Sequence, residues 1–358
     1  MRLDASTLPA LALGCGILGT GGGGSTDVGL LASLQAVEDF GPVPVVDLDD
    51  LPGDGLLMPC GGIGAPTVSI EKIESGHEGT RLREMVERLH GRPVVAFMAG
   101  EIGGSNGLIP AVWAARAGVP VVDADGMGRA FPEIPQVTME VAGISPNPAV
   151  MTDERGNVIV FRAVDGHWME RMERAAAVEF GGMSWSSEYQ LSVAEAKAGA
   201  VVRGSISLGV RIGNAVLQAE HDPVEALVEE LRAALLIVGK VMDVERRTTG
   251  GFVRGSATIE GLGADAGRAL RLEIQNENLI ALESERVLAT VPDLISVLDT
   301  QSAAAISTER LRYGQRVSVI AFPCAPIWRS PRGLELAGPR AFGYDVDYVP
   351  IEELHARA

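Results

Sequence analysis

The sequence has few of the residues that build disulfide frameworks or zinc sites. Its 358 residues include three cysteines, Cys15, Cys60 and Cys324, an odd number with no C-x-x-C spacing. The five histidines show neither H-x-H nor H-E-x-x-H spacing, so a helix-borne zinc site has no support. Unpaired cysteines of this kind are typical of a reducing compartment. We therefore expect a cytoplasmic protein whose hydrophobic core needs neither disulfides nor a structural metal.

Positive charge and long apolar runs are also scarce. Lysine and arginine number 30 against 47 aspartates and glutamates, which gives a formal net charge of −17. Nucleic acids and anionic membranes attract clustered cations, so neither is an expected partner. No run of about 20 apolar residues predicts a membrane-spanning helix. Small molecules or other proteins, including further copies of this chain, are the partners that we expect.

The first 165 residues alternate apolar strands with helical stretches. The pattern predicts strands at residues 43–51, 55–64, 93–99 and 119–123, and helices near residues 80–90 and 108–118. Strands that alternate with helices favour a mainly parallel sheet covered on both faces. We therefore predict a three-layer α/β sandwich as a first domain of residues 1–165.

After residue 165 the pattern changes to short alternating runs. The stretches "GAVVRGSISLGVRIG", "GFVRGSATIEGL", "RALRLEIQNENLIAL" and "QRVSVIAFP" have the period-two patterning and glycine punctuation of antiparallel strands. One helix interrupts them, with Asp222 as N-cap, Pro223 at its first position and an apolar stripe from Val224 to Val238. Residues 166–358 are therefore predicted to form a β-rich, barrel-like domain with at least one helix.

A glycine-rich stretch, "GCGILGTGGGGS", runs from Gly14 to Ser25. Its first residues match the dinucleotide-binding pattern G-x-G-x-x-G, which requires a preceding strand and a helix that starts at the turn. The preceding "LPALAL" contains a proline and little β-branching, and a glycine run cannot begin a helix, because glycine costs about 1 kcal/mol per interior position. Ser25 stands where a P-loop requires lysine. Neither nucleotide motif is therefore supported.

Gly21, Gly22, Gly23 and Gly24 could instead form a ligand cradle. Without side chains, several of their backbone N–H groups can point at one anionic or carbonyl group, and a helix from about Ser25 adds its positive dipole end. The alternative is a flexible linker in front of a helix capped by Ser25 or Asp27. We favour the cradle, because similar glycine-rich loops follow the other predicted strands.

The loop "GEIGGSNG" carries two candidate site residues. Glu101 comes at the end of a strand among glycines, where a carboxylate is well placed to act as a general base, the alternative being a solvated side chain with no role. Asn106 could donate a hydrogen bond to a substrate carbonyl or, alternatively, cap the helix that begins beside Leu108. Ligands of such sheets bind beyond the carboxyl ends of the strands, so this loop and the glycine run are expected to share one site.

The next strand ends in "VVDADGMGRAF", which carries three charged candidates. Asp123 and Asp125 could bind a divalent cation through their oxygens, or one of them could act as acid or base. Arg129 could clamp a substrate carboxylate with its guanidinium group. The alternative is that both aspartates cap turns and Arg129 neutralises them. No other cofactor is predicted.

The sequence gives weaker support for a functional role of two further residues. Cys60 would be a nucleophile only if a nearby cation stabilised its thiolate, and we expect a buried thiol instead. Asn276, in the amide-rich "QNENL", could face the cleft between the domains. No serine lies in G-x-S-x-G, so a nucleophile-elbow hydrolase is not predicted.

Several longer strings occur in order along nearly the whole chain. They are "LALGCGILGTGGGG", "GAPTVSIEK", "GEIGGSNGL", "VVDADGMGRAFPE", "QNENLIA", "PDLISVLD" and "RYGQRVSVIAFPCAPIW". Together they resemble the S-methyl thiohydantoin desulfurase-like family, which is often associated with hydantoinase and oxoprolinase proteins. The resemblance implies an α/β sandwich followed by a barrel-like β domain, and substrates that are five-membered cyclic imides or their thio analogues.

For an S-methylated thiohydantoin, such an enzyme would add water to the ring carbon that bears sulfur and release methanethiol. We assign Glu101 or Asp125 as the base, the amides of Gly21–Gly24 with Asn106 as donors, and Arg129 as anchor. If a metal takes part, Asp123 and Asp125 are its expected ligands. The competing hypothesis is a non-catalytic subunit that binds a cyclic imide or a hydantoinase- or oxoprolinase-type protein.

Overall fold

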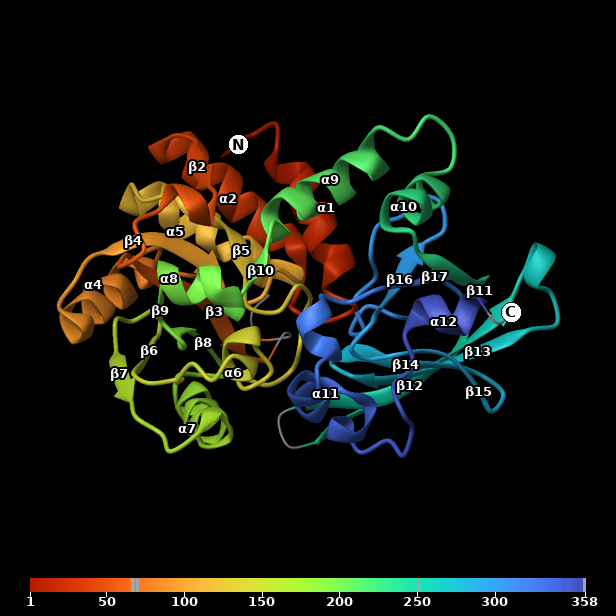
Figure 1. The fold of residues 1–358 in the computed structure, drawn as a ribbon. Coiled ribbons are helices and arrows are strands. Elements are labelled where there is room, and N and C mark those ends of the chain that lie inside the picture. Colours follow the sequence, from red (N-terminus) through yellow and green to blue (C-terminus); the bar gives the residue numbers. More distant parts are fainter. Residues whose placement is uncertain (66–67, 69–70, 250–251, 357–358) are drawn as a thin grey trace.

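The computed structural model describes residues 1–65, 68, 71–249 and 252–356. Part of the "GAPTVSIEK" string therefore lies outside the described residues. Figure 1 shows an α/β region, which contains the N-terminus, beside a β-rich region drawn in cyan and blue. This arrangement confirms the predicted α/β region followed by a barrel-like β region. None of the helices described is long and apolar enough to cross a membrane.

Four parallel strands form the centre of the N-terminal sheet, in the order β2-β5-β4-β3. They are β2 (Val43–Val46), β5 (Val121–Asp125), β4 (Val94–Ala99) and β3 (Leu56–Gly64). β3 and β4 are apolar and mostly buried, as expected for strands that are covered on both faces. Because the strands are parallel, their carboxyl ends meet at one edge of the sheet.

Antiparallel strands extend this sheet at its margins. They are β1 (Arg2–Leu3), β6 (Ala149–Thr152), β7 (Val158–Phe161), β8 (Met183–Ser187), β9 (Leu191–Ser192) and β10 (Val202–Arg203). β8 and β9 pair with β3, and β10 pairs with β5. The chain thus returns to the first sheet after residue 165, before it enters the second.

Helices accompany this sheet. They are α1 (Leu8–Leu18), α2 (Thr26–Phe40), α4 (Glu78–His90), α5 (Ile109–Ala117), α6 (Thr138–Val141), α7 (Gly166–Glu179), α8 (Val193–Glu195) and α9 (Ser205–Leu217). The predicted helices near residues 80–90 and 108–118 are confirmed as α4 and α5. α5 contacts all four central strands, and α7 packs against β3 and β8.

The predicted strand in "GAVVRGSISLGVRIG" is wrong beyond Arg203, because α9 occupies Ser205–Leu217. Its buried residues recur at helical spacing, and two glycines let it approach α1 closely. A Cβ at Gly213 would lie 1.8 Å from the carbonyl oxygen of Ala10, and one at Gly14 would lie 1.9 Å from that of Gly209. Gly14, the first glycine of the apparent dinucleotide motif, therefore lies inside a helix and serves helix packing.

Seven strands form the C-terminal sheet of the described residues, in the order β15-β14-β13-β12-β11-β17-β16. They are β11 (Ala234–Thr249), β12 (Phe252–Gly261), β13 (Ala269–Gln275), β14 (Glu277–Glu283), β15 (Arg286–Thr290), β16 (Leu294–Asp299) and β17 (Arg316–Phe322). All are antiparallel to their neighbours, and the sheet curls into a half-barrel around its own apolar core.

Three helices accompany this sheet: α10 (Pro223–Leu231), α11 (Pro331–Ala337) and α12 (Ile351–Ala356). The predicted helix start is confirmed, because the Asp222 side chain accepts hydrogen bonds from the backbone N–H groups of Val224 and Glu225. The predicted apolar stripe of this helix, from Val224 to Val238, extends beyond the end of α10 at Leu231. Leu235 and Val238 belong to β11, which starts after Arg232 ends the helix in a left-handed conformation.

Short helical turns complete the chain: η1 (Leu48–Asp50), η2 (Gly104–Gly107), the π-helical η3 (Ala196–Ala200), η4 (Gly263–Asp265), η5 (Pro326–Arg329) and η6 (Pro339–Phe342). Of these, η2 matters most for the site. It lies between β4 and α5, at the edge of the sheet where the strands end.

Candidate functional site

Both regions of the molecule line a cavity of about 460 Å³. The α/β region contributes the glycine run, the loop after β4, and residues of α7 and β8. The half-barrel contributes the turn between β13 and β14, at Asn276 and Glu277. The size is that of a small-molecule site, and its place beyond the carboxyl ends of β3 and β4 is where ligands of parallel sheets bind.

The glycine run is packed between the two regions. The carbonyl of Gly21 accepts a hydrogen bond from the N–H of Thr308 (2.9 Å), and that of Gly23 accepts one from Ser105 (2.8 Å). A Cβ at Gly23 would lie 2.2 Å from the Gly103 carbonyl oxygen, and the Gly23 φ of +73° also favours glycine. These contacts argue against a loose linker.

Helix α2 begins directly after this run. Ser25 is its N-cap and accepts a hydrogen bond from the N–H of Asp27, as one of the two predicted caps. Within the part of the chain that the structure describes, the N–H groups of Gly23 and Gly24 donate to no protein acceptor. Gly22, Gly23 and Gly24 line the cavity, whereas Gly21 does not.

Glu101 and Asn106 lie together in the cavity wall. The Asn106 amide donates to Glu101 Oε1, and its Oδ1 accepts a hydrogen bond from the Gly62 N–H (2.9 Å). Glu101 Oε2 accepts one from the Phe131 N–H (3.2 Å). Burial raises the pKa of Glu101 to about 8, although these two donors favour its ionised form. The predicted alternative that Asn106 caps α5 is wrong, since the N-cap position is Leu108 and no side chain caps it.

Glu277 is the site residue that sequence reasoning missed. It is 2% exposed and lines the cavity, and its Oε2 has no hydrogen-bond partner among the described residues. Burial, and next the charge of Glu101, raise the pKa of Glu277 well above its usual value. A Cβ at Gly22 would lie 1.9 Å from Glu277 Oε1, so the glycine there leaves room for the carboxyl group.

Asn276 holds the turn that presents Glu277. Its φ is +56°, and its Oδ1 accepts a hydrogen bond from the Val253 N–H (2.9 Å). Asparagine tolerates this left-handed conformation better than most residues. Asn276 also lines the cavity. The carboxylate beside it in "QNENL" was the available signal for Glu277, but nothing in the sequence indicates that Gly22 is its neighbour.

The two aspartates of β5 do not line the cavity. Asp125 Oδ2 accepts hydrogen bonds from the N–H groups of Ile102 (2.8 Å), Met127 (3.0 Å) and Gly128 (2.7 Å). Asp123 accepts hydrogen bonds from the N–H (3.0 Å) and hydroxyl of Ser207. These partners correspond to the turn-holding alternative, in which Asp125 fixes two loops and Asp123 fixes the first turn of α9.

The predicted metal ligands, Asp123 and Asp125, are not part of a larger cluster of ligand side chains among the described residues. Among the residues that the structure describes, no group of three or more histidine, cysteine, aspartate or glutamate side chains is arranged to hold a metal ion. Asp125 is fully buried, which raises its pKa to about 6 against the opposing effect of the three N–H donors.

Arg129 joins the two regions. It is fully buried and donates to the carbonyls of Pro292 (2.6 Å) and Asp293 (3.0 Å) and to the Thr20 hydroxyl (3.0 Å). It does not line the cavity, so the predicted role of substrate anchor is unsupported. Its positive charge partly offsets the raised pKa values of Glu101 and Glu277.

Cys60 is buried, as expected, and burial raises the pKa of its thiol well above the usual value. A neutral buried thiol is a poor nucleophile.

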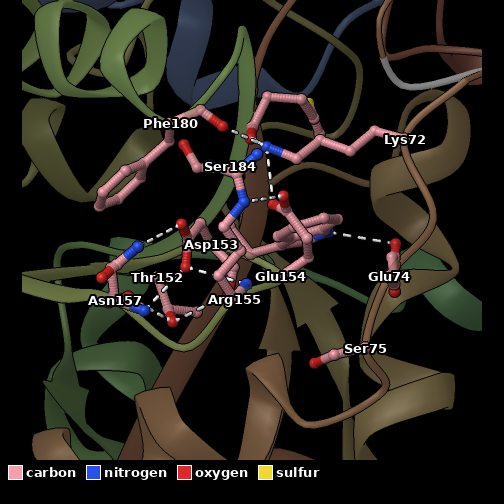
Figure 2. A network of polar contacts seen from close by, with 12 residues as sticks. Lys72, Glu74, Ser75, Thr152, Asp153, Glu154, Arg155, Asn157, Phe180 and Ser184 are labelled. Carbon is pink, nitrogen blue, oxygen red and sulfur yellow. Dashed lines mark hydrogen bonds and ion pairs between the residues drawn. The ribbon is translucent and has the colours of Figure 1, made fainter.

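A second wall of the cavity, near β8, carries Lys72 and Glu74 (Figure 2). The Lys72 ammonium group donates to the carbonyls of Met183 (2.6 Å) and Phe180 and pairs with Glu154 (2.8 Å). Glu74 accepts a hydrogen bond from the Trp185 indole N–H (3.1 Å). Lys72 is therefore held by protein groups.

The fold and the cavity define an α/β protein in which a half-barrel covers the strand-end edge of a parallel sheet. Two family models match the chain: the S-Me-THD-like N-terminal domain over residues 6–163 and the S-Me-THD-like C-terminal domain over residues 164–351. The chain belongs to this family, which confirms the resemblance drawn from its sequence.

A crystal structure of a protein from Chromobacterium violaceum has the same fold. Its TM-score is 0.81 at 26% sequence identity, over 98% of this chain and 100% of that one. No curated protein matches the chain.

Proposed function

We propose that this protein is a hydrolase of five-membered cyclic imides that converts S-methyl thiohydantoins into hydantoins and methanethiol. One observation carries the proposal: two buried glutamates from different regions, Glu101 and Glu277, line one cavity together with the glycine run. Membership of the S-Me-THD-like family supports the substrate class.

The two carboxyl groups are suited to opposite tasks. Glu101 has two hydrogen-bond donors and a pKa of about 8, so part of its population is ionised at neutral pH and can act as a general base. Glu277 lies beside that charge with an unpartnered oxygen, which favours its protonated form and suits a general acid. Asn106 is then a positioning residue that orients Glu101.

The proposed reaction balances with these two groups alone. Glu101 takes a proton from water as the water oxygen bonds to the ring carbon, and Glu277 gives a proton to the ring nitrogen as its C=N bond becomes single. The tetrahedral carbon then forms a C=O bond and expels the sulfur. In this step the Glu277 carboxylate takes the hydroxyl proton, and Glu101 returns its proton to the thiolate, which leaves as methanethiol.

The glycine amides supply the remaining polar contacts in this proposal. The N–H groups of Gly23 and Gly24 are free of protein acceptors within the described residues and line the cavity. Preorganised N–H groups of this kind stabilise developing negative charge on an oxygen or hold a ring carbonyl. Arg129 lies outside the cavity lining, and its positive charge acts on Glu101 and Glu277.

The test is an incubation of the purified protein with S-methyl thiohydantoins, thiohydantoins and hydantoins, with and without a chelator. We expect thiol release from the S-methyl compounds only, with a hydantoin as the ring product. A surface variant, Glu225→Gln on α10, is the control and should release thiol at the wild-type rate. If no ring compound yields thiol alone, but the chain stimulates a hydantoinase or oxoprolinase, the partner-subunit hypothesis replaces this one.

A further inference from the structure

The turn that presents Glu277 is fastened to the segment of the glycine run on both sides of that residue. On one side, the Asn278 N–H donates to the carbonyl of Thr20, which directly precedes Gly21 (2.8 Å). On the other, the Asn276 carbonyl accepts a hydrogen bond from the hydroxyl of Thr308. The position of this turn in the cavity wall therefore depends on these two contacts.

Thr308 contacts both regions of the molecule at once. It is fully buried, in the loop between β16 and β17. Its backbone N–H donates to the carbonyl of Gly21 (2.9 Å), and its hydroxyl also lies 3.2 Å from that carbonyl oxygen. Since the same hydroxyl donates to Asn276, one buried side chain links the glycine run of the α/β region to the turn of the half-barrel.

The methyl group of Thr308 explains Gly21, the member of the glycine run that does not line the cavity. A Cβ at Gly21 would lie 2.7 Å from Thr308 Cγ2 and 3.0 Å from Asn278 Nδ2. The Gly21 φ of +96° also favours glycine. The run therefore has two uses: its first glycine lets the half-barrel dock, and the next three line the cavity.

The same loop also reaches helix α2. Arg310 pairs with Asp27 (2.8 Å), but half or more of each side chain is exposed. Exposed ion pairs contribute little to stability, because water competes for both charges. A buried carbonyl that loses its donor is much less favourable, because it has no water to replace the lost bond. The Thr308 hydroxyl is therefore the contact of this loop that should matter most for the placement of Glu277.

We propose that Thr308 is a positioning residue for Glu277. Its hydroxyl holds the Asn276 carbonyl against the glycine run and thereby keeps the Glu277 carboxyl group beside Gly22. This inference rests on the proposed function, in which Glu277 is the general acid. Thr308 itself does not line the cavity, so it contacts no bound ring. Loss of its hydroxyl should therefore lower kcat and leave KM unchanged, because proton transfer depends on the placement of the acid.

Kinetics of Thr308→Val test the assignment, because valine keeps nearly the same shape and the backbone N–H but lacks the hydroxyl. We expect kcat for an S-methyl thiohydantoin to fall by about tenfold, with KM within about twofold of the wild type. Thr308→Ser, which keeps the hydroxyl, should have a kcat within about twofold of the wild type. A folded Thr308→Val protein with wild-type kcat overturns the proposal. So does a Thr308→Ser protein that loses as much activity as Thr308→Val, or loses about tenfold where the valine variant does not fold.

Thr152→Val is the matched control. Thr152 is also fully buried, its hydroxyl donates to the carbonyl of Asn157 (2.8 Å), and like Thr308 it does not line the cavity. Its loss should leave kcat within about twofold of the wild type, because the bond lies in a turn that carries no proposed catalytic group. Equal losses of kcat in the two valine variants would reveal a general effect of destabilisation and overturn the positioning role.

Hydrogen exchange measured by mass spectrometry gives a readout that needs no turnover. Thr308→Val should speed the exchange of amide hydrogens in residues 276–280 by about tenfold, because the turn opens locally when one of its contacts is lost. Thr152→Val should leave that exchange at the wild-type rate. Wild-type exchange in a folded Thr308→Val protein overturns the docking role of the hydroxyl.

Failure of this inference and failure of the proposed function give different results. Thiol release by the wild type, with an unchanged kcat in Thr308→Val, overturns the positioning role alone. Faster exchange of residues 276–280 in Thr308→Val, without thiol release from any S-methyl compound by the wild type, overturns the hydrolase proposal and leaves the docking of the turn by Thr308 in place.

Discussion

Two neighbouring strands, β4 and β5, end in acidic residues that the protein uses in opposite ways. At the end of β5, Asp125 receives three backbone N–H groups on one oxygen and lies outside the cavity. After β4, Glu101 receives one side-chain and one backbone donor, and its carboxyl group lines the cavity. An acid saturated by backbone donors holds loops together, whereas one with few donors beside a cavity is available for proton transfer.

The largest effect should come from Glu101. Glu101→Gln removes the proposed base, so we expect kcat/KM for an S-methyl thiohydantoin to fall by about 10²–10⁴-fold. The rate of thiol release measures this, and thermal unfolding checks that the variant is folded. Wild-type turnover by a folded variant would remove Glu101 from the mechanism and end the contrast with Asp125.

Asp125 should matter for stability instead. Asp125→Ala leaves three N–H groups without their acceptor, and each unsatisfied buried group costs roughly 1–3 kcal/mol. We expect the free energy of unfolding, measured with denaturant, to fall by about 3 kcal/mol or more. Asp123→Ala, which removes the acceptor from one helix turn, is the comparison and should cost about 0.5–2 kcal/mol. Equal losses would contradict the anchoring role of Asp125.

Gly22 tests whether Glu277 belongs with Glu101. A Cβ at Gly22 would lie 1.9 Å from Glu277 Oε1, while one at Gly61, also in the cavity lining, has open space around it. Gly22→Ala should displace the carboxyl group and lower kcat/KM by about tenfold, less than the loss of a general base. Gly61→Ala should stay within about twofold of the wild type. Similar activities of the two variants would separate Glu277 from the chemistry.

The smallest of these effects is the expected change in kcat/KM with pH near neutrality. A base must be ionised, and the pKa of Glu101 is raised to about 8, so kcat/KM should rise with pH up to about 8 and fall again where Glu277, the proposed acid, loses its proton. Below that value the loss approaches about tenfold per pH unit. Rates between pH 5.5 and 9 measure the profile. A flat profile across about pH 8 would show that a different group acts as base.

Much of the fold could be predicted from the sequence, and the predictions that were wrong share one cause. The central strands β3 and β4 and the helices α4 and α5 occur close to their predicted places, because long apolar runs and helical spacing are local signals. α9 was predicted as strand because its glycines resemble strand punctuation. Those glycines are explained only by the backbone of α1, which lies far away in the sequence.

The functional site shows the same division between local signals in the sequence and contacts with distant segments. The sequence by itself determined that carboxylate and amide side chains end the strands, and hence that Glu101, Asn106 and the glycine run would gather at one edge of a parallel sheet. Only the tertiary structure decided which acids face the cavity. Asp125 turns to three N–H groups of its own loops, and Glu277 arrives from the half-barrel opposite Gly22. The reason is physical: burial and hydrogen-bond partners set the use of a carboxyl group, and both come from distant segments.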